Sequence, residues 1–321
     1  PSAEPAPSAD DRGRGNFATA GGPGGGIHGV DDAILHTLVY ADLFDYPLTT
    51  EEIHRYLTGY PAPLSLVEEH LQRNGRSGEQ WASVSRFWFL AGREHLVDLR
   101  RQRESYSQVL WPKARRFGRL IADLPFVRMV SITGSLAMHN VTNPQDDVDL
   151  LIVTAEDRVW LGRALVILVV HLGRRFGVEL CPNYVMAESC LEMGEPSLYI
   201  AHELAQLLPL HGADIYHRLL KSNAWMVDYL PNASPRRPEE DRSGPAKYRG
   251  QQLVEALLGG RLGDGLEQWE RERKIPRLRQ IAIEKGGTGT SYNAKLCKGH
   301  IDDHAAAVQE RYDAQLAELG L

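Results

Sequence analysis

The chain has few cysteines and no long apolar run, and each shortage limits what the protein can be. Its 321 residues include three cysteines, Cys181, Cys190 and Cys297. A small, odd number of cysteines in a chain of this size does not suggest a disulfide framework, so we expect a cytoplasmic protein in a reducing environment. The most apolar stretch, residues 164–170, is far shorter than the run of about 20 residues that spans a bilayer. We therefore expect a buried helix there and no association with a membrane.

An excess of positive charge is also lacking. The chain has 36 Lys and Arg against 42 Asp and Glu, a formal net charge of -6. This balance argues against a surface that is basic throughout and coats nucleic acid. Hydrophobic residues make up 43% and charged residues 24% of the chain, which is ordinary for a globular protein, and the length allows two or three domains.

Two aspartates downstream of a Gly-Ser pair are the most informative feature that is present. Residues 130–138 are VSITGSLAM, a polar loop follows, and residues 147–153 are DVDLLIV. In a strand, residues two apart project from the same face. Asp147 and Asp149 therefore point one way, while the apolar residues beside them point into a core.

Such a pair of carboxylates can hold Mg²⁺, which takes carboxylates, waters and substrate phosphates as ligands. The Gly134-Ser135 pair opens a helix, where free N–H groups face an anion and glycine lets the backbone approach it closely. The pattern therefore predicts a metal-assisted phosphoryl-transfer site formed by Asp147, Asp149, Gly134 and Ser135. A strand that merely ends in two solvated acids is the structural alternative.

This arrangement of Gly134-Ser135, eleven intervening residues and Asp147-Val148-Asp149-Leu150 resembles the motif of the nucleotidyltransferase superfamily. That superfamily includes DNA polymerase beta and the aminoglycoside nucleotidyltransferases. The resemblance covers roughly residues 126–186. It implies that Ser135 and the Gly134 backbone contact the phosphates of an NTP. It also implies that Asp147 and Asp149 bind Mg²⁺, with Mn²⁺ as the alternative ion.

Short phrases further along the chain resemble those of a bacterial group within the same superfamily. They are residues 180–184 (LCPNY), 201–205 (AHELA) and 223–225 (NAW), followed by 230–232 (LPN). This closer likeness implies no particular reaction and no particular acceptor.

The superfamily usually places a third carboxylate on a neighbouring strand, where it binds the catalytic metal and helps to deprotonate the attacking group. The resemblance makes Glu179 the candidate, because it stands between apolar Val178 and Leu180 in the strand-like run 177–186. Asn183 lies on the same face, two strand periods further on, and is the weaker, neutral alternative. If neither residue serves, the protein binds nucleotide without turning it over.

Residues 30–90 are predicted to form three short helices and a pair of strands, which resemble a winged-helix module. Thr49 is expected to cap the second helix, and the third begins at Ser65. The third helix of such a module often binds DNA, but here it carries Glu68 and Glu69, which oppose binding to a polyanion. A scaffolding or substrate-presenting role is therefore favoured over binding to nucleic acid.

The fold class expected is α/β (α+β), with a nucleotidyltransferase fold, an N-terminal winged-helix-like domain and a C-terminal helical segment. The expected segments are a disordered tail (1–29), the winged-helix-like domain (30–92), a linking helix (93–125), the catalytic domain (126–232), a linker (233–247) and the C-terminal helical region (248–321). Within them, Pro112 is expected to interrupt the linking helix, and residues 198–230 are expected to be helical.

The sequence thus predicts a Mg²⁺-dependent nucleotidyltransferase that moves an NMP from an NTP to a hydroxyl or amine of an unidentified acceptor. The acceptor is either a small molecule or a protein. The alternative is a catalytically weak or silent nucleotide-binding protein with a regulatory role, which uses its winged helix to bind nucleic acid or a partner.

Overall fold

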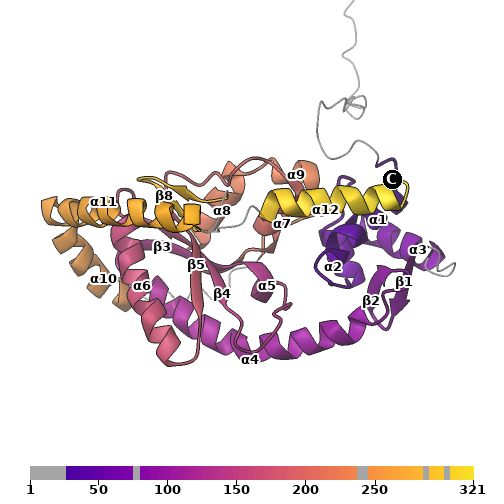
Figure 1. Ribbon diagram of the computed structural model, residues 1–321, viewed down its shortest axis with the longest axis horizontal. Coiled ribbons are helices and arrows are strands. Elements are labelled where there is room, and N and C mark those ends of the chain that lie inside the picture. Colours follow the sequence, from indigo (N-terminus) through magenta and orange to yellow (C-terminus); the bar gives the residue numbers. More distant parts are fainter. Residues whose placement is uncertain (1–26, 75–79, 237–244, 285–288, 300–303) are drawn as a thin grey trace, which may run out of the picture.

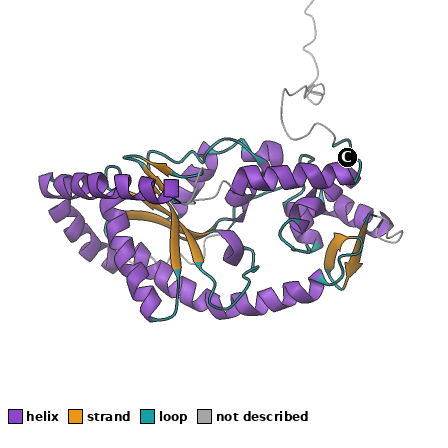
Figure 2. Ribbon diagram, in the orientation of Figure 1, coloured by secondary structure: helices purple, strands orange, loops and turns teal. Residues whose placement is uncertain are grey.

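The computed structural model describes residues 27–74, 80–236, 245–284, 289–299 and 304–321. Over these ranges the chain is a mixed α/β structure with a central mixed sheet and helices around it (Figures 1 and 2). The tail expected at 1–29 lies almost wholly outside the described residues, as does much of the linker expected at 233–247. None of the described helices is both long enough and apolar enough to cross a membrane.

The first described part has three helices followed by a hairpin, in the expected order. These elements are α1 (Val30–Asp42), α2 (Thr50–Arg55), α3 (Leu64–Asn74), β1 (Trp81–Val84) and β2 (Phe87–Leu90). Thr49 caps α2 as expected, because its side chain accepts a hydrogen bond from the backbone N–H of Glu52 while the Glu52 carboxylate accepts from the Thr49 N–H.

Helix α4 (Leu96–Ala122) runs unbroken along the lower side of the molecule, from the hairpin to the central sheet (Figure 1). The expected interruption at Pro112 is wrong. Pro112 lies on the exposed side of the helix, while Trp111 and Ala114 beside it are buried in the core. The burial of this face holds the helix together although the proline removes one backbone hydrogen bond.

The central sheet has the strand order β6-β3-β4-β5-β8-β7. Its strands are β3 (Val127–Ile132), β4 (Val148–Thr154), β5 (Leu180–Ala187), β6 (Leu208–His211), β7 (Ser291–Tyr292) and β8 (Leu296–Lys298). Strands β4 and β5 are parallel and are joined by helix α6 (Val159–Arg175); the other neighbours are antiparallel. Between β3 and β4 lies the short helix α5 (Gly134–Ala137).

Three of these strands come from regions expected to be helical. Residues 198–230 form α7 (Leu198–Gln206), α8 (Ala213–Ser222) and α9 (Met226–Tyr229), but also the edge strand β6. The C-terminal region forms α10 (Pro245–Leu258), α11 (Arg261–Glu284) and α12 (His304–Glu318), and also adds β8 and β7 to the sheet. Strands of two to four residues are too short to show a period of two, so they cannot be recognised from hydrophobic periodicity.

Two cores lie on the two faces of the sheet, and β4 contributes to both by alternation. Leu150 and Ile152 are buried in the core that contains α4 and α6. Leu151 and Val153 are buried in the other core, which contains α1–α3, α7 and α12. Asp149 has the parity of Leu151 and Val153, so its side chain faces the N-terminal helices.

Candidate active site

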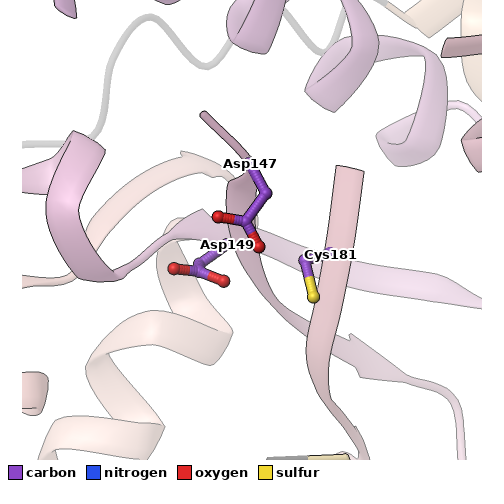
Figure 3. A group of neighbouring side chains, drawn as sticks. All are labelled: Asp147, Asp149 and Cys181. Carbon is purple, nitrogen blue, oxygen red and sulfur yellow. The ribbon is translucent and has the colours of Figure 1, made fainter. Parts of the chain in front are cut away.

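The two aspartates of the motif lie together at the start of β4. Asp147 immediately precedes the strand and Asp149 is its second residue. The adjacent Val148 and Leu150 are fully buried, which fixes the aspartates on the opposite face. Ligand atoms of Asp147, Asp149 and Cys181 all lie within 4.8 Å of one another, and Figure 3 shows the three side chains gathered in one place. Cys181 enters the cluster because it pairs with Asp149 in the β4–β5 register.

The Gly-Ser turn lies directly against these aspartates, although eleven residues separate them in the sequence. Gly134 has a φ of +63°, and a Cβ added to it would clash with Oδ2 of Asp149. The backbone N–H of Thr133 donates to the carbonyl oxygen of Asp149 at 3.0 Å. Only glycine combines this backbone conformation with so close an approach. The turn and the aspartates therefore form one site.

The loop after the turn is attached to the N-terminal part of the chain. The Tyr46 hydroxyl donates to the carbonyl oxygen of Met138 at 2.6 Å. Asn140 donates to the carbonyl oxygen of Phe44 at 3.3 Å and accepts from Arg103 of α4 at 3.1 Å. The segment that follows α1 and helix α4 thus fix one side of the site.

The surroundings of Asp147 and Asp149 disfavour two negative charges, so the pKa of each carboxyl group is raised. Burial raises the pKa of Asp149 to about 8, and the carboxylates of Asp147 and Glu203 add to this effect, while a hydrogen bond from Asn183 opposes it. Burial and the neighbouring Asp146 raise the pKa of Asp147. A cation bound between the two carboxylates would replace the proton and remove this repulsion.

The donor set fits a hard divalent cation. Asp147 and Asp149 supply carboxylate oxygens, which Mg²⁺ and Mn²⁺ prefer. Cys181 is not expected to act as a thiolate ligand, because burial and the two aspartates raise the pKa of its thiol to about 12. The thiol instead lies 3.0 Å from Oδ1 of Asn183 and donates to it. Asn183 in turn donates from Nδ2 to Oδ1 of Asp149, which orients that carboxylate.

Glu179, expected from the resemblance as the third carboxylate, is not brought into this cluster. It lies just before β5, and its carboxylate binds the guanidinium of Arg174 at the end of α6, with Nη2 2.5 Å from Oε1. This ion pair lowers the pKa of Glu179, and the side chain is 45% exposed. The strand position opposite Asp149 is occupied by a thiol instead.

A cavity of about 370 Å³ opens beside the turn, with Gly134, Ser135 and Asp149 on its wall. Its other walls include Tyr40 and Phe44, from α1 and just after it, and Tyr199, His202 and Glu203 from α7. The rings of Tyr40 and His202 are stacked, with centroids 3.8 Å apart. Burial raises the pKa of Glu203 to about 7 and lowers that of His202 to about 3.

The sequence alone does not indicate that Glu203 and the aromatic residues Tyr40, Phe44 and Tyr199 lie at the site. Glu203 stands out there only within the phrase at residues 201–205. The available signal was its place in a largely apolar helix, where a carboxylate has to face either solvent or a cavity. That it shares a cavity with Asp149 depends on how α7 packs, which the local pattern does not encode. Comparisons of the chain with protein-family models, with curated proteins and with solved structures found no match.

Proposed function

We propose that this chain is a Mg²⁺-dependent nucleotidyltransferase, with a nucleotidyltransferase fold and a winged-helix-like N-terminal module. It would transfer an NMP from an NTP to a hydroxyl or amine of an acceptor. The observation that carries the proposal is the convergence of Asp147 and Asp149 with the Gly134 turn, beside a cavity that Asp149 and the turn line.

The described residues of the site would have different roles. Asp147 and Asp149 would hold the divalent ion, and Asn183 keeps the Asp149 carboxylate in place. When bound, Mg²⁺ would polarise the α-phosphoryl group and neutralise the charge of the departing pyrophosphate. Gly134 lets the backbone approach the phosphates closely, and the Ser135 hydroxyl beside it supplies a hydrogen-bond donor.

In the transfer, an oxygen or nitrogen of the acceptor forms a bond to the α-phosphorus of the NTP. The bond from that phosphorus to the bridging oxygen breaks, pyrophosphate leaves, and the acceptor's proton passes to water. The cavity beside Asp149 places the acceptor next to the phosphates, which supplies the orientation that such a displacement needs.

The test is transfer of label from each α-labelled NTP to a cell extract, with Mg²⁺ present, together with release of pyrophosphate. The variants Asp147→Asn and Asp149→Asn are expected to lose on the order of 100-fold or more in rate, because each removes charge that stabilises the transition state. The control is Asp98→Asn, an exposed acid on α4 outside the cluster, which should leave the rate unchanged. Unchanged turnover in both variants would refute the proposal.

A second candidate is a protein that binds nucleotide without transferring it. It is favoured by one observation, the absence of Glu179 from the carboxylate cluster of the described residues. In this case NTP binds in a Mg²⁺-dependent manner and no pyrophosphate is released. A regulatory role through nucleic acid would add salt-dependent DNA binding, which the exposed Glu68 and Glu69 on α3 oppose.

A further inference from the structure

The cavity beside the site is built jointly by the N-terminal helices and by α7. Tyr40, Phe44 and Tyr46 come from the first part of the chain, while Tyr199 and Glu203 come from α7. Its volume of about 370 Å³ falls within the range typical of small-molecule sites. The N-terminal module therefore forms a wall of a small-molecule cavity next to the proposed reaction centre.

The charge that this cavity can carry near pH 7 is negative. Its described lining includes the carboxylates of Asp149 and Glu203 and no Lys or Arg. His202 does not offset them, since burial lowers its pKa to about 3 and keeps the ring neutral at pH 7. A triphosphate needs cationic partners, so this lining does not suit one.

Glu203 has nothing to neutralise it among the described residues. No hydrogen bond or ion pair of the described part of the chain reaches its carboxylate, and burial is the cause that raises its pKa. A divalent ion at Asp147 and Asp149 would leave Glu203 as the remaining free acid of the cavity. Glu203 is partly buried, where a carboxylate without a partner is costly, and a cationic ligand would remove that cost.

The aromatic rings around Glu203 favour the same kind of ligand. Tyr40, with His202 stacked on it, and Tyr199 line the same cavity as Glu203. The face of an aromatic ring attracts an ammonium group, and the attraction is stronger where water is excluded. The same rings pack against the apolar body of a ligand.

We propose that this cavity is the acceptor site and that it binds a small protonated amine with an apolar or aromatic body, through Glu203 and the tyrosine rings. Its assignment as the acceptor site rests on the proposed function, whereas its affinity for amines does not. The ammonium group lies against Glu203, and the rest of the molecule extends towards Ser135 and Asp149.

The test is isothermal titration of the full chain, without NTP or metal, with tyramine and with tyrosol. Tyrosol has the same body as tyramine but carries a neutral hydroxyl in place of the ammonium group. Tyramine is expected to bind at least about tenfold more tightly, as a charge-assisted hydrogen bond provides. Glu203→Gln should abolish this preference while leaving tyrosol binding unchanged. The matched control Glu69→Gln, an exposed acid on α3, should keep the preference.

A second variant tests the cavity independently in case Glu203→Gln does not fold. Phe44 lines the cavity and is 38% exposed, so Phe44→Leu should fold normally and weaken the binding of both probes while keeping the preference for tyramine.

Equal binding of tyramine and tyrosol to the native chain, or a preference that survives Glu203→Gln, would overturn the amine proposal. Displacement of tyramine by metal-free ATP would make the cavity a nucleotide site and overturn its assignment to the acceptor. Glu203-dependent binding of tyramine without any NTP turnover would refute only the proposed function.

Discussion

Gly134 is the residue at which backbone conformation and the site depend on each other most directly. Its positive φ is unfavourable for any side chain, and its α-carbon faces Oδ2 of Asp149 without room for a methyl group. The glycine was recognisable in the sequence as part of a turn. Its contact with Asp149 depends on the pairing of β3 with β4.

Gly134→Ala is expected to destabilise the fold by about 1–2 kcal/mol through the left-handed backbone, and also to abolish Mg²⁺-dependent turnover by displacing Asp149. The matched control is Gly177→Ala. Gly177 has a φ of +66° with nothing within 4 Å of an added Cβ, so it carries the backbone cost alone. Urea unfolding and the labelled-NTP assay measure the two effects. Equal losses of activity in both variants would contradict the close approach.

His202 is expected to make the fold sensitive to acid. Its pKa is about 3 in the folded chain because of burial, against an ordinary value of 6.5. Between these values the unfolded chain binds a proton that the folded chain does not, so stability falls as the pH drops below 6.5. In this range the free energy of unfolding falls by up to about 1.4 kcal/mol per pH unit.

His202→Phe removes this contribution and keeps a ring to stack on Tyr40. As the pH falls from 7.0 to 5.5, the unfolding free energy of the variant is expected to rise by about 1.3 kcal/mol relative to that of the native chain. Urea unfolding at the two pH values measures the difference. Identical changes in both proteins would show that His202 is protonated in the folded state.

At the scale of elements, helix α6 is capped by a residue that is distant in the sequence. Its N-cap residue, Arg158, has no capping side-chain hydrogen bond. Instead, the buried Glu267 of α11 accepts from the backbone N–H groups of Trp160 at 2.9 Å and Leu161 at 2.7 Å. The helix that joins β4 to β5 thus starts where α11 docks. No local cap signal in the sequence could have shown this.

Glu267→Ala is expected to lower the unfolding free energy by about 2 kcal/mol, because it leaves two backbone donors without their acceptor. Gln268→Ala is the control, since Gln268 is exposed on the same helix and should change stability by less than about 0.5 kcal/mol. Chemical unfolding followed by circular dichroism measures both. A similar loss in the two variants would mean that Glu267 contributes helix propensity and no cap.

At the scale of the whole molecule, the three N-terminal helices share their core with the rest of the described chain. One buried cluster contains Ile34 and Leu38 of α1, Leu151 and Val153 of β4, and Tyr312 of α12. The boundary expected after residue 92 therefore passes through a continuous core. It also passes beside the cavity, whose walls come from both sides.

The described part of the chain is therefore expected to unfold in one cooperative transition. Scanning calorimetry should give a calorimetric enthalpy equal to the van't Hoff enthalpy. Residues 27–92, expressed alone, should lack stable tertiary structure by near-ultraviolet circular dichroism, because their partners in the shared core are missing. Two resolved transitions, or a folded 27–92 fragment, would contradict a shared core.

The sequence by itself determined those features that follow from local geometry. The period of two in β4 places Asp147 and Asp149 on one face, the Gly134-Ser135 turn follows from its residues, and the cap of α2 follows from Thr49. These features depend on residues that are neighbours along the chain, so they can be recognised in the sequence.

Only the tertiary structure decided what meets the aspartates. It set Cys181 and Asn183 beside Asp149, and it brought Glu203 and the aromatic residues of the cavity lining to the same site. It also kept α4 continuous across Pro112 and added short strands to both edges of the sheet. These outcomes depend on which buried faces pack together, and burial energy depends on contacts between residues far apart in the chain.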